Sequence, residues 1–470
     1  MKSSLFESIK SLKSIARYPM HMPGHKRRIS PVPGLPADWD ITEIEGADDL
    51  HWPEGLLKSA MERTAEVWGA GRTWFLVNGS TCGIHAAIRT AAGLGGKIIA
   101  ARNCHKSVFH AVELCGIDAV WITPPVEEKF GIFASVPPEL VSRALEVEKD
   151  IKCMVITSPT YEGCISDIAA IAGICHTHGV PLIVDEAHGA HLGIYPEFPG
   201  GAVSLGADAV IQSAHKTLPS LTQTAFLHLS KNSLLDPEKI EYQLDIFETS
   251  SPSYPLMASL DGCTGIVENG RELFIKWRGA LDRFYKAAEN WRVLELFTGE
   301  EMVFLHDRSK LLISCRKADM TGLDLCGLIR EKGYEPEMVY GDNVLAMTGL
   351  GDDMEEIAQF GEVLSGIDAV LTPVGEEEKS KPGHLSGGVR VCSIWEAMGR
   401  ITRDVAIENA AGETAGEYVW AYPPGVPILA PGERIDRDII DTLKFLEKNG
   451  SRIVHTGARH LTKHIKCVQW

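Results

Sequence analysis

The feature that most constrains the fold is an alternation, from about residue 70 to 230, of short apolar runs with amphipathic stretches at helical spacing. This pattern predicts repeated βαβ units and an α/β fold with a mainly parallel sheet. The predicted strands are 73–77, 97–101, 119–122, 153–157, 181–185, 209–212 and 224–229. The predicted helices include 107–115, 138–148 and 167–178. Such sheets bind ligands at the C-terminal ends of their strands, and the polar clusters of this sequence follow those ends.

The alternating region lies within a chain of 470 residues, for which we predict three parts. They are an N-terminal arm at residues 1–60, a large domain with a helical connector at 61–300, and a smaller C-terminal α/β domain at 301–470. In the smaller domain we predict strands at 310–315 and 343–348 and helices at 322–332 and 353–364. The charged, turn-rich run at 374–383 is predicted to be a surface loop.

Composition argues against several classes of partner. The chain has 46 Lys and Arg against 63 Asp and Glu, a net charge of −17, and its one short basic cluster is Lys26-Arg27-Arg28, so we expect no nucleic-acid partner. Apolar runs such as 153–156 fall far short of the ~20 residues that cross a bilayer, and no signal peptide is evident. Eleven cysteines without a CxxC pair indicate reduced, mostly buried thiols. We therefore predict a cytoplasmic protein with no membrane partner.

The first chemically suggestive cluster is Asn78-Gly79-Ser80-Thr81-Cys82-Gly83, between a predicted strand and a helix expected from Ile84. Backbone N–H groups at a helix N-terminus, together with hydroxyls and glycines, form a cradle for an anion such as phosphate. The alternative interpretation is a capped helix end without a ligand.

The second cluster, Asp185-Glu186-Ala187-His188-Gly189-Ala190-His191, follows an apolar strand and places Asp185 at the strand's C-terminal end. A carboxylate there can hold a cationic ring nitrogen. The alternative is a metal site built from Asp185, Glu186, His188 and His191. Gly189 between the two histidines argues against a helix that would direct both at one ion, and we predict no metal ligand.

The third cluster, Ser213-Ala214-His215-Lys216-Thr217, also follows a strand, and its lysine could act as an amine nucleophile toward an aldehyde. Before the Asp185 cluster comes a further set, Asn103-Cys104-His105-Lys106-Ser107. In order, the chain thus offers an anion cradle, the polar set at 103–107, a carboxylate for a basic nitrogen and a lysine. Pyridoxal phosphate, with its phosphate, flat ring, ring nitrogen and aldehyde, needs one of each.

The motifs NGST, RNCHKS, TSPTYEG, DEAHGAH and SAHKT, in this order and spacing, resemble the bacterial ornithine/lysine/arginine decarboxylases in their compact form. The resemblance extends to MPGHK (22–26), DITEIEGADDL (40–50), SSPSYPLMASLD (250–261) and YPPGVPILAPGE (422–433). It implies a fold type I pyridoxal-phosphate enzyme, with an aspartate aminotransferase-like large domain and a smaller C-terminal α/β domain.

The resemblance also implies roles for individual residues. Lys216, His105 and Asp185 would be catalytic: Lys216 would bond to the cofactor aldehyde, His105 would stack on the ring and Asp185 would pair with the ring nitrogen. Ala187 would pack beneath the ring, and His188 would lie near its 3-hydroxyl group. The phosphate would be held by Ser80, Thr81, Ser213 and His215 and, from the neighbouring subunit of a homodimer or a multiple of it, by Thr249.

The expected reaction is decarboxylation of a basic L-amino acid to its amine, with arginine favoured over lysine or ornithine, in polyamine synthesis. The arm segment 43–49 offers carboxylates to a cationic side chain, although it could equally be a solvated acidic loop. Two alternatives remain open. An aminotransferase or aldolase would use Lys216 and Asp185 in the same way, and a metal-dependent hydrolase would use the second cluster.

Overall fold

The computed structural model describes residues 4–14, 38–299, 302–374, 387–422, 425–448, 452–457 and 463–470. The MPGHK motif, the basic cluster at 26–28 and most of the predicted loop at 374–383 lie outside these residues. The chain divides into two compact units, each made of discontinuous stretches. The first unit contains 1–91, 168–275 and 349–351, and the second contains 92–167, 276–348 and 352–470. The predicted domain boundaries at residues 60 and 300 stay a prediction.

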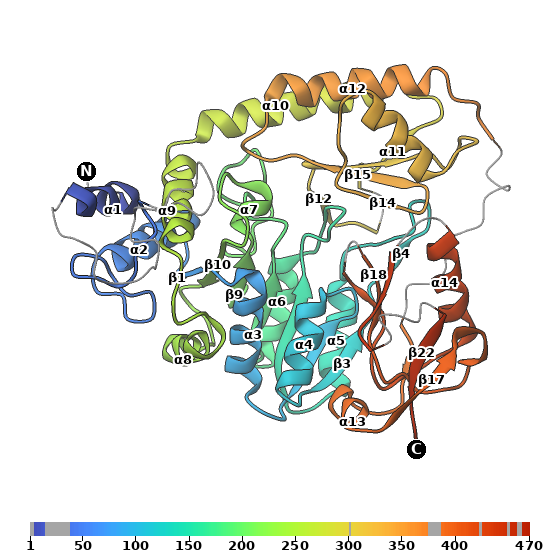
Figure 1. The fold of residues 1–470 in the computed structure, drawn as a ribbon, viewed down its shortest axis with the longest axis horizontal. Helices are drawn as coiled ribbons and strands as arrows, with labels where there is room; N and C mark the ends of the chain where they lie inside the picture. Colours follow the sequence, from blue (N-terminus) through green and yellow to red (C-terminus); the bar gives the residue numbers. More distant parts are fainter. Residues whose placement is uncertain are drawn as a thin grey trace. The chain divides into compact units, whose positions relative to one another are not determined.

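The first unit is built on four strands in the order β1-β10-β9-β8, of which Figure 1 labels β1, β10 and β9. They are β1 (Arg72–Leu76), β10 (Ala225–Leu229), β9 (Ala209–Gln212) and β8 (Leu182–Asp185). β8 and β9 are parallel, with Asp185 paired to Ile211, whereas β10 is antiparallel to both of its neighbours. Twelve residues, 213–224, join β9 to β10, and they contain the short helix α7 (Ala214–Thr217).

Helices of the first unit flank these strands. They are α1 (Leu5–Ser14), α2 (Leu56–Trp68), α3 (Gly79–Ala92), α6 (Ile168–Thr177), α7 (Ala214–Thr217), α8 (Pro237–Phe247) and α9 (Tyr254–Glu268). The predicted start of a helix at Ile84 is wrong, because α3 begins at Gly79. A Cβ at Gly83 would lie 2.6 Å from Cδ1 of Leu76, so this glycine lets α3 pack closely on β1. That packing outweighs the low helix propensity of glycine.

The second unit contains three parallel strands in the order β6-β2-β3 and a separate antiparallel sheet in the order β11-β13-β15-β14. The parallel strands are β6 (Ile151–Thr157), β2 (Lys97–Ala101) and β3 (Asp118–Ile122). The antiparallel strands are β11 (Glu295–Leu296), β13 (Lys310–Ser314), β15 (Asn343–Met347) and β14 (Met338–Tyr340). The helices are α4 (Lys106–Leu114), α5 (Pro138–Val147), α11 (Gly322–Glu331), α12 (Met354–Asp368) and, from residue 276 onward, α10 (Arg271–Ala288). Short pairs join β4 (Val126–Glu127) to β5 (Ile132–Phe133) and β7 (Cys164–Ile165) to β12 (Leu305–His306).

The C-terminal part of the second unit has its own apolar core, which includes Leu429, Ile435, Leu443 and Ile465. Its helices are α13 (Ile394–Met398), α14 (Arg437–Lys448) and the 3-10 turn η2 (Ile407–Asn409). Its strands are β16 (Val389–Arg390), β17 (Thr402–Ala406), β18 (Val419–Tyr422), β19 (Pro427–Leu429), β20 (Glu433–Arg434), β21 (Arg452–His455) and β22 (His464–Val468). β18 pairs with both β19 and β21, which brings segment 427–429 alongside β18.

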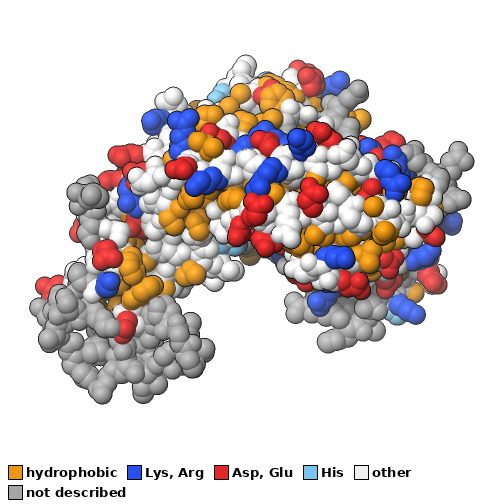
Figure 2. All heavy atoms as spheres, turned by 90° about the horizontal axis from the view of Figure 1, so that it is seen from above, with side chains coloured by type: hydrophobic (Ala, Val, Ile, Leu, Met, Phe, Trp, Pro, Cys, Tyr) orange, Lys and Arg blue, Asp and Glu red, His pale blue; other side chains and the backbone are white. Residues whose placement is uncertain are grey.

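The predicted α/β class with mainly parallel pairing is confirmed, and each predicted strand lies within two residues of an observed one. All eleven cysteines lie in the described part of the chain, where they are buried and none forms a disulfide. On the face drawn in Figure 2, basic and acidic side chains are interspersed and form no large patch of one sign. None of the helices in the described ranges has both the length and the apolarity needed to cross a membrane.

Candidate active site

Two side chains of opposite charge lie at the C-terminal end of the parallel pair β8 and β9. Asp185 ends β8 and is 2 % exposed, and Lys216 lies in α7, the short helix that follows β9. The Lys216 Nζ is 2.8 Å from Nε2 of His188, which is also buried. The strand ends thus bring together Asp185, His188 and Lys216, as the sequence predicted.

The environment of Asp185 fits a cationic nitrogen donor. Burial raises the pKa of Asp185, and two opposing effects, the charge of Lys216 and a hydrogen bond from the Ala187 backbone N–H at 3.2 Å, offset this only in part. A protonated pyridine nitrogen at the carboxylate would favour its ionised form. Ala187 itself is buried, with a side chain small enough to leave room for a flat ring.

The anion cradle lies at the first turn of α3. Gly79 has a φ of 76°, and the helix that follows directs its first backbone N–H groups toward the turn. Ser213, at the start of α7, donates a hydrogen bond from its hydroxyl to that of Ser80, at 3.0 Å, so hydroxyls of two segments converge there. Ser80 is half-buried and Thr81 is exposed. This donor set suits a phosphate.

His215 is oriented by the backbone. Its Nδ1 is 2.8 Å from the carbonyl oxygen of Thr224, in the loop before β10, and burial lowers its pKa. Because the carbonyl can only accept, Nδ1 carries a proton. The half-buried ring therefore keeps Nε2 for another partner.

Two side chains that the sequence analysis missed hold the chain just before the cradle. Glu248 accepts hydrogen bonds from the Val77 N–H at 3.3 Å and from the Cys82 thiol at 3.4 Å. Gln223 donates its amide to the Val77 carbonyl and has a φ of 86°, unusual for a residue other than glycine. Burial raises the pKa of Glu248. Its position directly before Thr249 was the available signal.

The alternative metal site is not supported by the geometry. Consecutive strand residues face opposite sides, and the Glu186 carboxylate accepts instead from the Ala202 N–H at 2.8 Å and the Gln212 amide at 2.6 Å. His188 contacts Lys216, while His191 is fully buried. Within the described ranges, no group of three or more His, Cys, Asp and Glu residues could hold an ion.

His105 belongs to the second unit, where it precedes α4 after the end of β2. Its Nδ1 accepts from the Ser107 backbone N–H at 3.3 Å and lies 2.9 Å from the Ser107 hydroxyl, which fixes the ring orientation. Two other polar groups occupy the C-terminal ends of the neighbouring parallel strands β2 and β6. The side-chain oxygens of Asn103 and Thr157 are buried and have no hydrogen-bond partner among the described residues. Buried oxygens of this kind are groups that a ligand could satisfy.

The segment that follows α8 contains Thr249, which the sequence analysis assigned to the phosphate of a neighbouring subunit. Thr249 is half-buried, and its carbonyl lies 2.8 Å from the ring Nε2 of His51. Its role toward a neighbouring subunit stays a prediction. In the arm, the role of segment 43–49 toward a substrate cation stays a prediction, and Asp48 of that segment has backbone partners. Its carboxylate accepts the Gly55 and Leu57 backbone N–H groups at 2.9 Å, at the start of α2, where N–H groups lack helical partners.

Comparison with known proteins gives two family matches. Residues 32–302 match "Orn/Lys/Arg decarboxylase, major domain", and residues 393–453 match the C-terminal domain of the same family. A relative described as uncharacterized protein YaaO, from Bacillus subtilis, is 34% identical over 422 residues, which cover 87% of this chain and 85% of that protein. The arginine decarboxylase of Halalkalibacterium halodurans is 33% identical over 445 residues, or 91% of this chain and 89% of that one. The lysine decarboxylase LdcF of Francisella novicida has the same fold, with a TM-score of 0.80 at 18% identity, over 99% of this chain and 80% of that one.

Proposed function

This chain belongs to the Orn/Lys/Arg decarboxylase family, and from that premise we propose that arginine is the amino acid it decarboxylates. It is a pyridoxal-phosphate-dependent lyase that acts on a basic amino acid. The observation that carries the choice of arginine is the 33% identity, over 91% of the chain, to a relative named arginine decarboxylase. Relatives named lysine decarboxylase are at most 26% identical among those compared.

A negative local field supports a cationic substrate. Burial raises the pKa of Tyr254, and the nearby charges of Glu43, Asp48 and Asp49 raise it further. Tyr254 begins α9, directly after the segment that contains Thr249. Glu43 is exposed, so its carboxylate is accessible from solvent. Such charge favours a guanidinium or ammonium group over a neutral side chain.

The site residues take the following roles in this proposal. When bound, pyridoxal phosphate supplies an aldehyde that captures the substrate amine and a ring that withdraws the electrons left when CO2 departs. The Lys216 amine must lose a proton to act as nucleophile, and His188 Nε2, at 2.8 Å, accepts it. Asp185 keeps the ring nitrogen protonated. Lys216 or His105 then delivers a proton to the substrate Cα.

The remaining site residues position the cofactor. Ser80, Thr81, Ser213 and His215 bind its phosphate, and Ala187 packs against the ring. The hydrogen bond between Ser213 and Ser80 supports a shared position for their hydroxyls. The Nδ1–H of His215 donates to the Thr224 carbonyl, and this leaves Nε2 to face the phosphate.

Product analysis tests the substrate. The purified protein is incubated with equimolar arginine, lysine and ornithine, and the amines and CO2 are measured by mass spectrometry. We expect the arginine-derived amine in excess, with the Lys216→Ala variant as control for protein-dependent turnover. An excess of the lysine- or ornithine-derived amine would overturn the choice of arginine. Keto acid without CO2 would instead indicate an aminotransferase.

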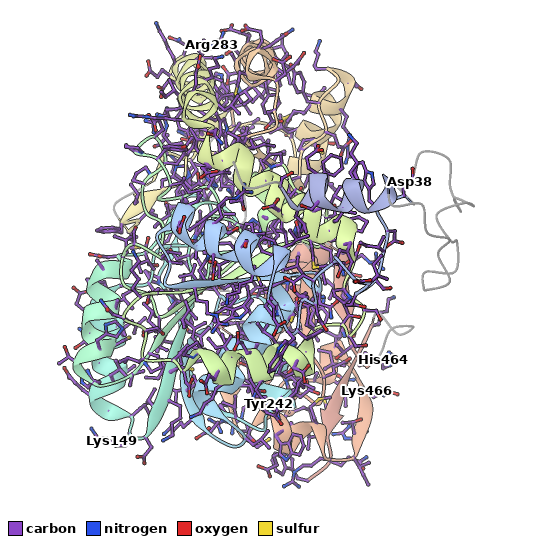
Figure 3. The ribbon with its side chains drawn as sticks, turned by 90° about the vertical axis from the view of Figure 1, so that its left-hand side faces the viewer. Asp38, Lys149, Tyr242, Arg283, His464 and Lys466 are labelled. Atoms are coloured by element: carbon purple, nitrogen blue, oxygen red, sulfur yellow. The ribbon has the colours of Figure 1, made fainter. Side chains whose placement is uncertain are left out.

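We further infer a homodimer, or a multiple of it, with Thr249 reaching the partner's phosphate. Tyr242 is 64% exposed and Ile246 is 44% exposed, one turn apart on α8, which leads into Thr249. Figure 3 places Tyr242 at the outer surface of this helix. Exposed apolar side chains beside a site are suited to subunit contact. Light scattering should show a dimer that Ile246→Asp weakens and Val370→Asp, at another exposed apolar residue, does not. An active monomer would refute the dimer.

We also infer a cytosolic location. The support is chemical, because eleven buried cysteines without a disulfide among them suit a reducing compartment. Recovery of the protein from a secreted or periplasmic fraction of the producing cell would contradict it.

A further inference from the structure

We propose that Arg102 and Glu433 are positioning residues, which hold the loop that presents His105 to the cofactor. The inference rests on the proposed function for the role of His105 in stacking on the ring. It gives a structural role to the YPPGVPILAPGE motif (422–433), whose residues take no part in the proposed reaction. Arg102 lies in the major-domain match and Glu433 in the C-terminal-domain match, and both belong to the second compact unit.

The contact is a buried, two-pronged ion pair. Nε and Nη2 of Arg102 each lie 3.1 Å from a different carboxylate oxygen of Glu433. Arg102 is 2% exposed and Glu433 is 5% exposed. The guanidinium also donates to the carbonyl of Pro427 at 2.6 Å and to that of Ile428 at 3.2 Å. One side chain thus connects the end of β2 to β19 and to the start of β20.

A second contact fixes the other end of the same loop. The Lys106 backbone N–H donates to the Gly425 carbonyl at 3.2 Å. Only Asn103, Cys104 and His105 lie between the two anchored residues, so the C-terminal segment holds the loop on both sides of the histidine. Within that segment, Glu433 also accepts the Ala430 N–H at 2.8 Å, which fixes the turn that carries the carboxylate.

Fold stability alone does not explain a buried pair of this kind. Removing two charges from water is unfavourable, and apolar residues of similar volume often stabilise such a position as well or better. A planar guanidinium bound to two carboxylate oxygens fixes orientation as well as distance. A stacking ring needs that precision, because its contact with a flat cofactor depends on the angle between the two planes as well as on their separation.

The test uses the full-length holoenzyme. One variant combines Arg102→Met with Glu433→Leu, so that no unpaired charge is left in the interior. The matched control combines Arg403→Met with Glu413→Leu at an exposed ion pair of 2.8 Å in the same C-terminal part. For each protein, we would measure the melting temperature, the cofactor dissociation constant, the visible circular dichroism of the bound cofactor, kcat and KM.

We expect the Arg102/Glu433 variant to fold but to bind the cofactor about tenfold more weakly, as is typical when a residue supporting a ligand group is removed. Its kcat should fall about 100-fold at nearly unchanged KM, since a displacement of about 1 Å has that effect. The circular dichroism of the cofactor should change. The control pair should match the wild type in every measurement. Wild-type cofactor affinity and circular dichroism in the Arg102/Glu433 variant would overturn the proposal.

A double-mutant cycle with His105→Ala shows whether the pair acts through the histidine. We expect His105→Ala to reduce kcat in the wild type but to add little in the Arg102/Glu433 variant. Fully additive losses would overturn the proposal, because the pair would then act elsewhere. If the variant does not fold, Arg102→Lys retains the charge without the two-pronged geometry and should give the same loss of kcat; wild-type kcat would refute the role.

Hydrogen exchange separates this inference from the proposed function. In the full-length protein, with and without cofactor, the amides of residues 103–107 should exchange faster in the Arg102/Glu433 variant than in the control. Unchanged exchange would refute the positioning role whatever His105 does. Conversely, faster exchange combined with a harmless His105→Ala substitution would show that the pair holds the loop but that the stacking role is wrong, which also overturns the inference as stated.

Discussion

His228 gives a quantitative prediction about the polar network behind the site. The side chain is fully buried, with Nδ1 2.8 Å from the Thr73 hydroxyl and Nε2 3.1 Å from the Gln212 side-chain oxygen. The Gln212 amide group donates to Glu186, so its oxygen must accept the proton on Nε2 of His228. The Thr73 hydroxyl can donate to Nδ1, so the network satisfies the neutral form of the ring, which burial favours over the charged form.

Burial lowers the pKa of His228 to about 3, from the ordinary histidine value of 6.5. Between these values the unfolded state binds one more proton than the folded state, so stability rises with pH. The contribution is present above pH ~6.5 and is lost as the pH falls below it. At about pH 5 the loss amounts to about 2 kcal/mol, at about 1.4 kcal/mol per pH unit.

The perturbation is His228→Gln, which can still accept from Thr73 and donate to Gln212 but does not titrate. Because the chain forms two compact units, one global unfolding free energy is not a suitable measure, and hydrogen exchange of the β10 amides replaces it. From pH 7.5 to 5, after correction for intrinsic exchange, the wild type should lose about 2 kcal/mol more protection than the variant. The β13 amides, in the other unit, serve as control. Equal losses of β10 protection in the wild type and the variant would refute the assignment of His228 as a neutral, buried ring.

Three further predictions concern the site. Lys216→Ala should remain folded but lose the visible absorbance of the lysine-bound cofactor, and unchanged colour and turnover would contradict the assignment. Asp185→Ala should retain the cofactor, measured by absorbance titration, but lose turnover by orders of magnitude, because the ring nitrogen deprotonates; near-normal kcat would exclude the role. Glu248→Ala should weaken cofactor binding about tenfold by releasing the Val77 N–H, whereas the exposed Glu238→Ala should not; equal affinities would show that the cradle needs no such support.

The sequence predicts those parts of the fold that depend on local pattern. The bounds of β2 and β9 were predicted to the residue, because an apolar run between turn residues records both the length and the burial of a strand. The positions of Asp185 and Lys216 at strand ends were predicted for the same reason, since Asp185 ends one such run and Lys216 comes four positions after another. Their proximity depends only on the parallel direction of the two strands.

Features that depend on tertiary packing were not predicted. A Cβ at Gly83 of α3 would also lie 3.3 Å from Cγ2 of Ile211 in β9, 128 positions away, a contact that no window of local sequence contains. The support of Val77 by Glu248 joins residues 171 positions apart, and the pair of Arg102 and Glu433 joins residues 331 positions apart. In the sequence, Arg102 and Glu433 are indistinguishable from solvated surface groups, and Glu248 is marked only by its position directly before Thr249.

The separation of Arg102 and Glu433 along the chain has a consequence for synthesis on the ribosome. At 5–20 residues per second, roughly 15 to 70 s pass between the translation of the guanidinium and that of its carboxylate partner. Throughout this interval the nascent chain cannot bury Arg102 without an uncompensated charge, so the end of β2 stays hydrated and the cofactor has no completed site to enter. The site can therefore form only after nearly the whole chain has been translated. We expect a transcript truncated before codon 433 to yield a protein that is degraded, rather than a partially active enzyme.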